Sequence, residues 1–165
     1  MRQTHDCRFG HHATYLAAKI DRLDLLEKLF GSVYIPQGVF DELTSNSAYS
    51  DEAARIGSCH FIQVKQTDRN SVSQFQDRTG LDLSESEAIV LTNELHAELT
   101  LIDERNARSI AKQLGLTIMS TVGILGLSVR KGFLTTDDIR HYIKIFKENN
   151  RHIDELLFKN LLESV

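Results

Sequence analysis

The sequence is poor in cysteine, has no long apolar run and carries no excess of basic residues, and each shortage excludes a class of protein. Two cysteines, Cys7 and Cys59, are too few for a disulfide framework in 165 residues, so we expect reduced thiols in a cytoplasmic protein. No apolar run approaches the ~18 residues of a membrane-spanning helix. The first residues also contain no apolar stretch typical of a secretory signal. We therefore expect no membrane partner.

The charge balance limits the kind of nucleic-acid partner that we expect. The formal net charge of −4 argues against a general nucleic-acid coat protein, because such proteins are basic. It leaves open an enzyme that contacts a few phosphates locally. The sequence also lacks a glycine-rich phosphate loop, since Gly123 and Gly126 do not belong to a nucleotide-binding pattern, and we interpret them as helix-packing residues.

A cluster of potential metal ligands lies near the N-terminus, at His5, Cys7, His11 and His12. Structural zinc sites take well-spaced cysteine and histidine ligands from two knuckles, whereas this cluster has one cysteine and no second knuckle. We therefore favour a disordered or poorly packed terminus over residues 1–18.

Helix-like and strand-like segments alternate along the rest of the chain. The predicted strands are residues 33–35, 61–64, 99–102 and 116–119. The predicted helices are residues 13–30 (two short helices, the second capped by Asp21), a helix opened by Pro36, and residues 51–56, 84–95, 104–114, 122–130 and 135–146, followed by a last helix. Residues 66–80 are predicted to be a mobile lid or a short helix. This alternation predicts an α/β fold with a parallel sheet, in one domain over residues 1–165 that ends in C-terminal helices over residues 135–165.

Three acidic residues lie where an α/β sheet presents side chains at a helix start or a strand end. Asp103 follows a buried-type strand, where parallel sheets bind ligands, but it could instead be the N-cap of the next helix. Glu87 could be a metal ligand, or it could close a capping box with Ser84. Glu42 could be a third ligand, or a solvated acid near a helix N-terminus. Carboxylates brought together in this way hold Mg²⁺ or Mn²⁺ against a phosphodiester.

Two other groups of residues have a functional and a structural interpretation. Thr121 and Ser120 follow a predicted strand and could hold a metal-bound water or a phosphate oxygen, although either could cap the next helix. Arg105, Arg108 and Lys112 recur on one face of the helix after Asp103. This stripe could contact backbone phosphates, or it could be a solvated helix face.

Two long blocks of the sequence closely resemble the PIN-domain proteins. They are IDRLDLLEKLFGSVYIPQGVFDEL and GLDLSESEAIVLTNELHAELTLIDERNARSIAKQLGLTIMSTVGILGL. The match is closest to a poorly characterised branch related to VapC-type toxins, and it covers about Lys19 to the C-terminus.

The resemblance implies a fold, an activity and a set of site residues. The implied fold is a three-layer α/β/α sandwich with a short parallel sheet. The implied activity is that of an endoribonuclease toxin that depends on Mg²⁺ or Mn²⁺, acts on RNA, pairs with a small antitoxin protein and forms a homodimer. The acids of the family site match Glu42, Glu87 and Asp103 as metal ligands, and Thr121 lies near its hydroxyl position, so these four are the predicted catalytic residues.

The N-terminus departs from the family pattern. The family begins with an apolar strand that ends in an aspartate, whereas this chain has THDCRFGHHATYLAAKI. Asp6 is too far from Lys19 and lacks the motif that follows the family aspartate, and no apolar run here is expected to form the strand. A second hypothesis is therefore a catalytically inactive PIN-like module that binds RNA or a protein partner. A third is a structural homo-oligomer built on the leucine-rich C-terminal helix.

Overall fold

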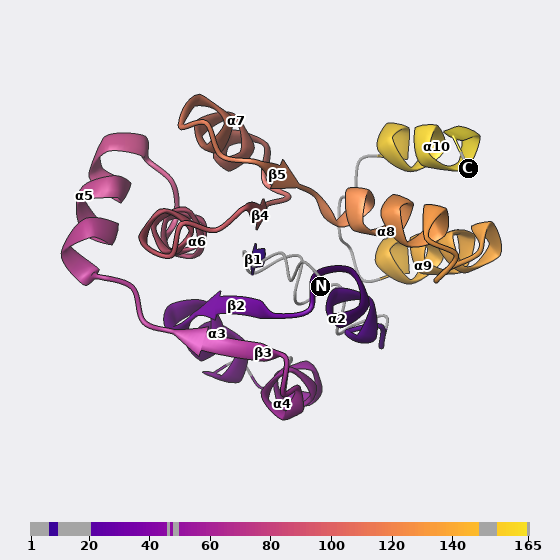
Figure 1. Cartoon of the computed structure of the whole chain (residues 1–165), viewed down its shortest axis with the longest axis horizontal. Helices are drawn as coiled ribbons and strands as arrows, with labels where there is room; N and C mark the ends of the chain where they lie inside the picture. Colours follow the sequence, from indigo (N-terminus) through magenta and orange to yellow (C-terminus); the bar gives the residue numbers. More distant parts are fainter. Residues whose placement is uncertain (1–6, 10–20, 46, 48–49, 149–154, 165) are drawn as a thin grey trace, which may run out of the picture. The chain divides into compact units, whose positions relative to one another are not determined.

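A computed structural model describes residues 7–9, 21–45, 47, 50–148 and 155–164, and the chain divides into two compact units, residues 1–119 and 120–165. The first unit holds a five-stranded sheet in the order β3-β2-β1-β4-β5, and each pairing between neighbours is parallel (Figure 1). The strands are β1 (Cys7–Phe9), β2 (Val33–Pro36), β3 (Ile62–Lys65), β4 (Leu99–Leu101) and β5 (Ile118–Met119). A parallel sheet with helical connections is the α/β fold that the alternating pattern predicts.

The central strand β1 overturns the expectation that the N-terminal segment contains no strand. Cys7 pairs with Val33 on one side and with Leu99 on the other, so the strand lies between β2 and β4. Strand pairing uses the N–H and C=O groups that every non-proline residue carries. A segment of three residues can therefore satisfy the backbone of its neighbours, and it is too short to show a periodic apolar pattern, which is why the pattern did not reveal it.

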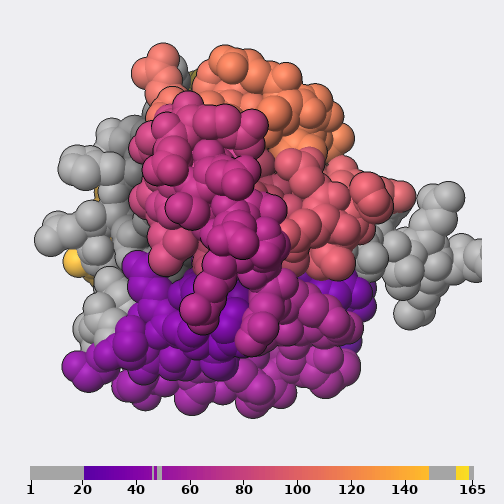
Figure 2. All heavy atoms as spheres, turned by 90° about the vertical axis from the view of Figure 1, so that its left-hand side faces the viewer, coloured from indigo at the N-terminus to yellow at the C-terminus, as the bar shows by residue number. Residues whose placement is uncertain are grey.

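Six helices of the first unit are described. They are α2 (Asp24–Phe30), α3 (Gln37–Ser45), α4 (Ser50–Ser58), α5 (Arg69–Thr79), α6 (Leu83–Glu94) and α7 (Arg105–Gln113). Helix α6 packs against β1, β2 and β4, and α2 and α3 pack against β2. Residues 66–80 are thus a helix with a capped start rather than a lid, and Figure 2 shows α5, in magenta, at the front of that view.

Apolar side chains of α5, α6 and α7 form one buried cluster with the sheet. Val72 and Phe75 of α5 pack there with Ile89 of α6 and with Ile102, which follows β4. A buried hydrogen bond joins α6 to β4 as well: the hydroxyl of Thr92 donates to the carbonyl of Ala88 at 2.7 Å and lies 2.9 Å from the hydroxyl of Thr100. Since the Thr92 proton is already used, Thr100 must donate to Thr92.

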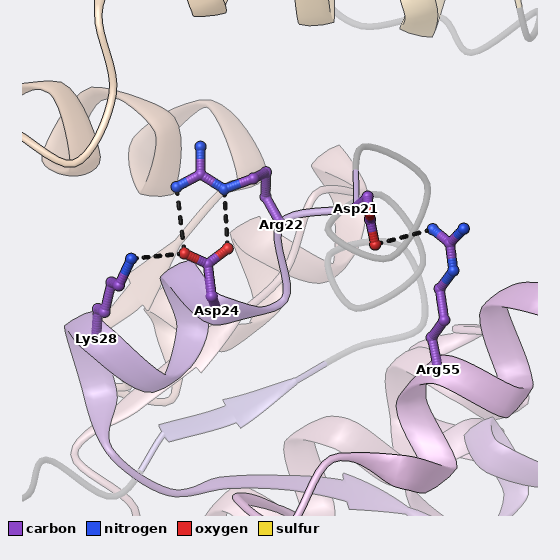
Figure 3. Close-up of polar contacts among 5 residues, drawn as sticks. All are labelled: Asp21, Arg22, Asp24, Lys28 and Arg55. Atoms are coloured by element: carbon purple, nitrogen blue, oxygen red, sulfur yellow. Dashed lines mark hydrogen bonds and ion pairs between the residues drawn. The ribbon is translucent and has the colours of Figure 1, made fainter.

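The structure corrects two predicted helix starts. Asp21 does not cap a helix: its φ of 56° is left-handed, whereas an N-cap takes an extended backbone, and α2 begins at Asp24. Asp21 instead forms an ion pair with Arg55 at 3.1 Å (Figure 3). Pro36 ends β2 rather than opening α3, which starts at Gln37.

Asp24 is the centre of a small ion-pair group at the start of α2 (Figure 3). Its carboxylate accepts from the Arg22 guanidinium at 2.8 Å and from the Lys28 ammonium at 2.7 Å. The hydrogen bond from Arg22 is the main reason that the pKa of Asp24 is lowered, and Lys28 adds to the effect, whereas burial opposes it.

The second unit consists of helices in its described residues. They are α8 (Thr121–Arg130), α9 (Thr136–Glu148) and α10 (Glu155–Ser164). Gly126 of α8 allows close contact with α10, because an ideal Cβ at this position would lie 2.7 Å from Cδ1 of Leu161. This agrees with the helix-packing interpretation of Gly126. Across the described residues of both units, no helix has the length and apolar character needed to cross a bilayer.

Candidate functional site

The parallel strands all end at one edge of the sheet, and two of the predicted acids come from segments that follow these ends. Helix α3, which carries Glu42, begins directly after β2. Asp103 follows β4 by two residues and is half-buried. In open parallel sheets ligands bind beyond the carboxyl ends of the strands. Both acids therefore lie in segments that begin at the edge where a ligand is expected.

Glu87 of α6 meets α3 at Gly38. An ideal Cβ at Gly38 would lie 2.5 Å from Oε1 of Glu87 and 2.7 Å from its Cδ, and closer still to Oε2. Real Cβ atoms do not approach other heavy atoms so closely, so only glycine leaves room for this carboxylate. The backbone amide of Val39, in the first turn of α3, acts to lower the pKa of Glu87, and the helix dipole there also favours negative charge.

The surroundings of Glu87 disfavour its ionised form. The pKa of Glu87 is raised, first by burial and then by the negative charge of Asp41, with a smaller contribution from Glu42. Hydrogen bonds from the side chain of Thr67 and from the Val39 amide oppose this shift without cancelling it. Oxygen Oε2 of Glu87 is buried and has no hydrogen-bond partner among the described residues. Among the described residues, the site therefore holds a carboxylate oxygen without a hydrogen-bond partner, and the neighbouring charges named above are negative.

The capping-box interpretation of Glu87 is wrong. Helix α6 begins at Leu83, and its N-cap is Asp82, whose carboxylate accepts from the backbone amide of Glu85 at 2.9 Å. Glu87 lies two residues beyond the position from which a capping-box glutamate reaches back. The neighbouring aspartate caps the helix, and Glu87 is turned toward α3.

Asp103 is also not a helix cap. Glu104 caps α7 by accepting from the amides of Asn106 at 2.9 Å and Ala107 at 2.6 Å. Asp103 is not among the charges that shift the pKa of Glu87. Glu87 thus lies near enough to Asp41 and Glu42 for their charges to raise its pKa, and Asp103 lies two residues after the end of β4.

Thr121 belongs to the second unit. It is the first residue of α8 and is buried, and the cap of this helix is Ser120, whose hydroxyl accepts from the amide of Gly123 at 3.2 Å. The capping interpretation is therefore correct for Ser120 but not for Thr121, and the catalytic role of Thr121 stays a prediction.

The basic stripe lies on α7, which follows Asp103 in the chain. Arg105 and Lys112 are exposed and Arg108 is half-buried. Within the part of the chain that the structure describes, none of the three forms an ion pair, in contrast to Arg22, which pairs with Asp24 (Figure 3). Cations that are not neutralised by protein acids are available for phosphates.

Sequence reasoning missed three residues that shape this site. Asp41 stands beside Glu42, and its charge affects Glu87 more strongly than that of Glu42 does. Gly38 leaves room for the Glu87 carboxylate and Thr67 acts to lower the pKa of Glu87, but no motif singled out either residue. Two adjacent acids, Asp41 and Glu42, were the signal in the sequence that could have pointed to Asp41. The sequence has no pattern for a close approach over a glycine or for the effect of a loop side chain, so Gly38 and Thr67 could not be found in this way.

For the residues that flank β1, only the sequence shows whether an acid is available to the site. Gly10 follows β1 directly, and Asp6 precedes it. Both lie outside the described residues, as do His5, His11 and His12 of the predicted zinc cluster. The carboxyl end of the central strand is thus not followed by an acid.

Comparison of the sequence with models of known protein families assigns the chain to a family. A family model for the PIN domain matches residues 14–165. The chain belongs to the PIN-domain family. PIN domains have a nuclease-type fold, generally use divalent metal ions and commonly bind nucleic acid. Among curated proteins, nothing matches the chain.

The residues around Glu87 fit a divalent cation in their chemistry. Mg²⁺ and Mn²⁺ prefer carboxylate oxygens, and a cation would offset the repulsion between Glu87 and the two acids of α3. Within the described ranges, however, no group of three or more histidine, cysteine, aspartate or glutamate residues is placed to hold a metal ion. The described part of the site therefore offers an acidic pair at α3 and α6 rather than a complete coordination shell.

Proposed function

We propose that this PIN-domain protein is an endoribonuclease that depends on Mg²⁺ or Mn²⁺ and acts as the toxin of a toxin–antitoxin pair. The observation that supports the proposal is the carboxylate of Glu87. Its buried oxygen Oε2 has no hydrogen-bond partner in the described part of the chain, it sits over the first turn of α3, and Asp41 and Glu42 add negative charge beside it. A carboxylate in these surroundings is stabilised by an opposite charge.

In this proposal Glu42, Glu87 and Asp103 would hold the ion. A bound Mg²⁺ or Mn²⁺ supplies a Lewis acid that aligns the scissile phosphate, lowers the pKa of a bound water and offsets charge on the leaving oxygen. Gly38 leaves the space over the first turn of α3 in which the Glu87 carboxylate lies.

Two further groups have predicted roles in the same reaction. The hydroxyl of Thr121 is predicted to contact a phosphate oxygen or a water. Arg105, Arg108 and Lys112 are predicted to bind backbone phosphates of the RNA, which would position the strand without reading its sequence.

Cleavage of a fluorogenic single-stranded RNA by purified protein, with Mn²⁺ and with Mg²⁺, tests the proposal. We expect cleavage that needs the metal and that falls at least tenfold in Asp103→Asn, whereas Asp77→Asn, which removes an exposed acid of α5, leaves the rate unchanged. Intact RNA at millimolar Mn²⁺, with a folded protein, would contradict the proposal.

A catalytically inactive PIN-like module that binds RNA or a protein partner is the second candidate. It is favoured by Gly10, which stands after the central strand without a carboxylate, and by the incomplete ligand set of the described residues. Calorimetric titration with Mn²⁺ distinguishes the nuclease from the inactive module. A stable protein that binds no Mn²⁺ favours the catalytically inactive module, and micromolar binding favours the nuclease.

The partners expected from the sequence stay part of this proposal. They are RNA, a small antitoxin protein and a second copy of the chain in a homodimer. The scarcity of cysteine remains the support for a cytoplasmic location. Sedimentation of the purified protein alone tests the homodimer. Sedimentation with the product of a neighbouring small open reading frame tests the complex with the antitoxin.

A further inference from the structure

We propose that a cavity between the ends of α5 and α7 binds a small organic acid, whose carboxylate contacts Arg78 and Gln113 and whose aromatic or branched apolar body lies on Phe75 and Ile110. The proposal goes beyond the nuclease function. None of its residues belongs to the predicted metal site or to the basic stripe of α7, so a test of one function does not decide the other.

The cavity lies within the first unit and has a volume of about 330 Å³. Small-molecule sites in proteins generally have volumes of about 300–1,000 Å³ and combine an apolar lining with a few polar groups, so this cavity suits a small ligand. Helix α5, which forms one wall, lies at the front of Figure 2. Three residues of α5 and three from the end of α7 line the cavity: Phe75, Arg78, Thr79, Ile110, Gln113 and Leu114.

The deepest part of the lining is apolar. Phe75 is buried and belongs to the core cluster of α5, α6 and α7, and Ile110 is half-buried against the same cluster. Leu114 is apolar as well, yet 49% of its surface is exposed. A ligand with an apolar body would remove surface of all three side chains from water, which favours binding.

The polar groups lie at the exposed rim. Arg78 and Gln113 are both exposed. Nε of Arg78 donates to the carbonyl of Gln74, one turn back in α5, at 3.3 Å. Within the described residues, the terminal nitrogens of Arg78 and the amide of Gln113 have no hydrogen bond or ion pair. A carboxylate has the charge and the two oxygen atoms that a guanidinium group binds best, so the rim favours an organic acid over a neutral ligand.

The two helix ends beside the cavity do not supply a competing binding group. The hydroxyl of Thr79 donates to the carbonyl of Phe75 at 2.7 Å, so its proton is not available to a ligand. The amide of Leu114 donates to the carbonyl of Ile110 at 3.1 Å. Helix C-termini repel anions through carbonyl groups that lack partners, and these two carbonyls have partners. Arg78 is thus the charged group of the lining.

Titration of isotope-labelled protein with 3-phenylpropionate, followed by NMR, tests the proposal. We expect saturable shifts of the backbone amide signals of Phe75, Thr79, Ile110 and Leu114, with a Kd in the millimolar range or below. The neutral probe 3-phenylpropanamide keeps the ring and the size but lacks the charge, so its Kd should be about tenfold higher. Acetate, which has no apolar body, should give no saturable shifts at millimolar concentration.

The variant Arg78→Gln removes the charge from the rim, and Arg69→Gln is the matched control, because Arg69 is an exposed arginine at the other end of α5. For 3-phenylpropionate we expect a Kd about tenfold higher in Arg78→Gln and an unchanged Kd in Arg69→Gln. Thermal unfolding shows whether both variants are folded, and the comparison of acid and amide in the wild type needs neither variant.

Three results would overturn the proposal. The first is the absence of saturable shifts with 3-phenylpropionate at millimolar concentration. The second is an equal Kd for the acid and the amide, or for the wild type and a folded Arg78→Gln. The third is a set of shifts confined to the basic stripe at Arg105, Arg108 and Lys112, since this would show binding of anions to exposed cations without a contribution from the cavity.

Discussion

The substitution Gly38→Ala tests whether the recess over α3 is needed by the site or only by the fold. A Cβ at this position would lie 2.5 Å from Oε1 of Glu87, and an ordinary contact begins at 3.4 Å. The carboxylate must therefore move by about 0.9 Å or more. A misplacement of about 1 Å in a catalytic constellation can reduce the rate on the order of 100-fold, so we expect RNA cleavage to fall by roughly this factor and Mn²⁺ binding to weaken.

The stability of the same variant is expected to be unchanged or slightly higher. The added methyl meets the far end of a flexible side chain, which can turn away. Gly38 is also not among the glycines with a left-handed backbone, and alanine is favoured over glycine in a helix by about 1 kcal/mol. Thermal unfolding should therefore give a melting temperature at or above that of the wild type.

Gly57→Ala is the matched control for this prediction. It adds the same methyl group to the neighbouring helix α4, where the nearest atom would be Cζ of Phe40 at an ordinary 3.7 Å. We expect wild-type cleavage and wild-type Mn²⁺ affinity. Gly38→Ala with undiminished Mn²⁺ affinity and activity, or Gly38→Ala that fails to fold, would refute the argument that the recess exists to hold Glu87.

Three further predictions concern hydrogen bonds and charge. Thr92→Val should lower the free energy of unfolding in urea by about 1–3 kcal/mol, because Thr100 keeps a buried hydroxyl without a partner; the double variant with Thr100→Val should recover part of the loss, and no recovery would contradict the inferred bond. Glu104→Ala should cost about 0.5–2 kcal/mol as a lost cap, and Asp103→Ala clearly less; equal losses would contradict the assignment of the cap. Since the pKa of Glu87 is raised by folding, its contribution to stability falls as pH rises from about 4.3 through the raised value. Glu87→Gln should therefore raise the melting temperature of the metal-free protein at neutral pH, and an equal or lower value would refute the repulsion.

The sequence predicts most of the fold because helix and strand periodicity is local. The apolar spacing that gives α6, α7 and α8 and the β-rich runs of β2 and β4 can be read within a few residues. The strand β1 could not be predicted in this way, since its pairing depends on backbone groups between two partners that are distant in the sequence. Helix caps were uncertain for a related reason, because Asp82 and Glu104 compete with nearby acids and serines of similar preference.

The site was predictable only where it coincides with the family pattern. Glu42 and Glu87 lie in blocks that resemble PIN domains, and the charge of Glu42 contributes to the raised pKa of Glu87. Gly38, Asp41 and Thr67 belong to no motif, since their roles depend on the packing of α3 and the β3–α5 connection against α6. Contacts between helices that are distant in the sequence leave no periodic trace in it.

Paramagnetic Mn²⁺ added to the isotope-labelled protein tests most directly whether the acids of α3, α6 and the end of β4 share one cation. At substoichiometric Mn²⁺, we predict that the amide signals of Val39, Glu87 and Asp103 broaden first, and that Glu87→Gln abolishes this selectivity. Broadening confined to other acids, or no selective broadening at millimolar Mn²⁺, would contradict the metal centre and with it the nuclease.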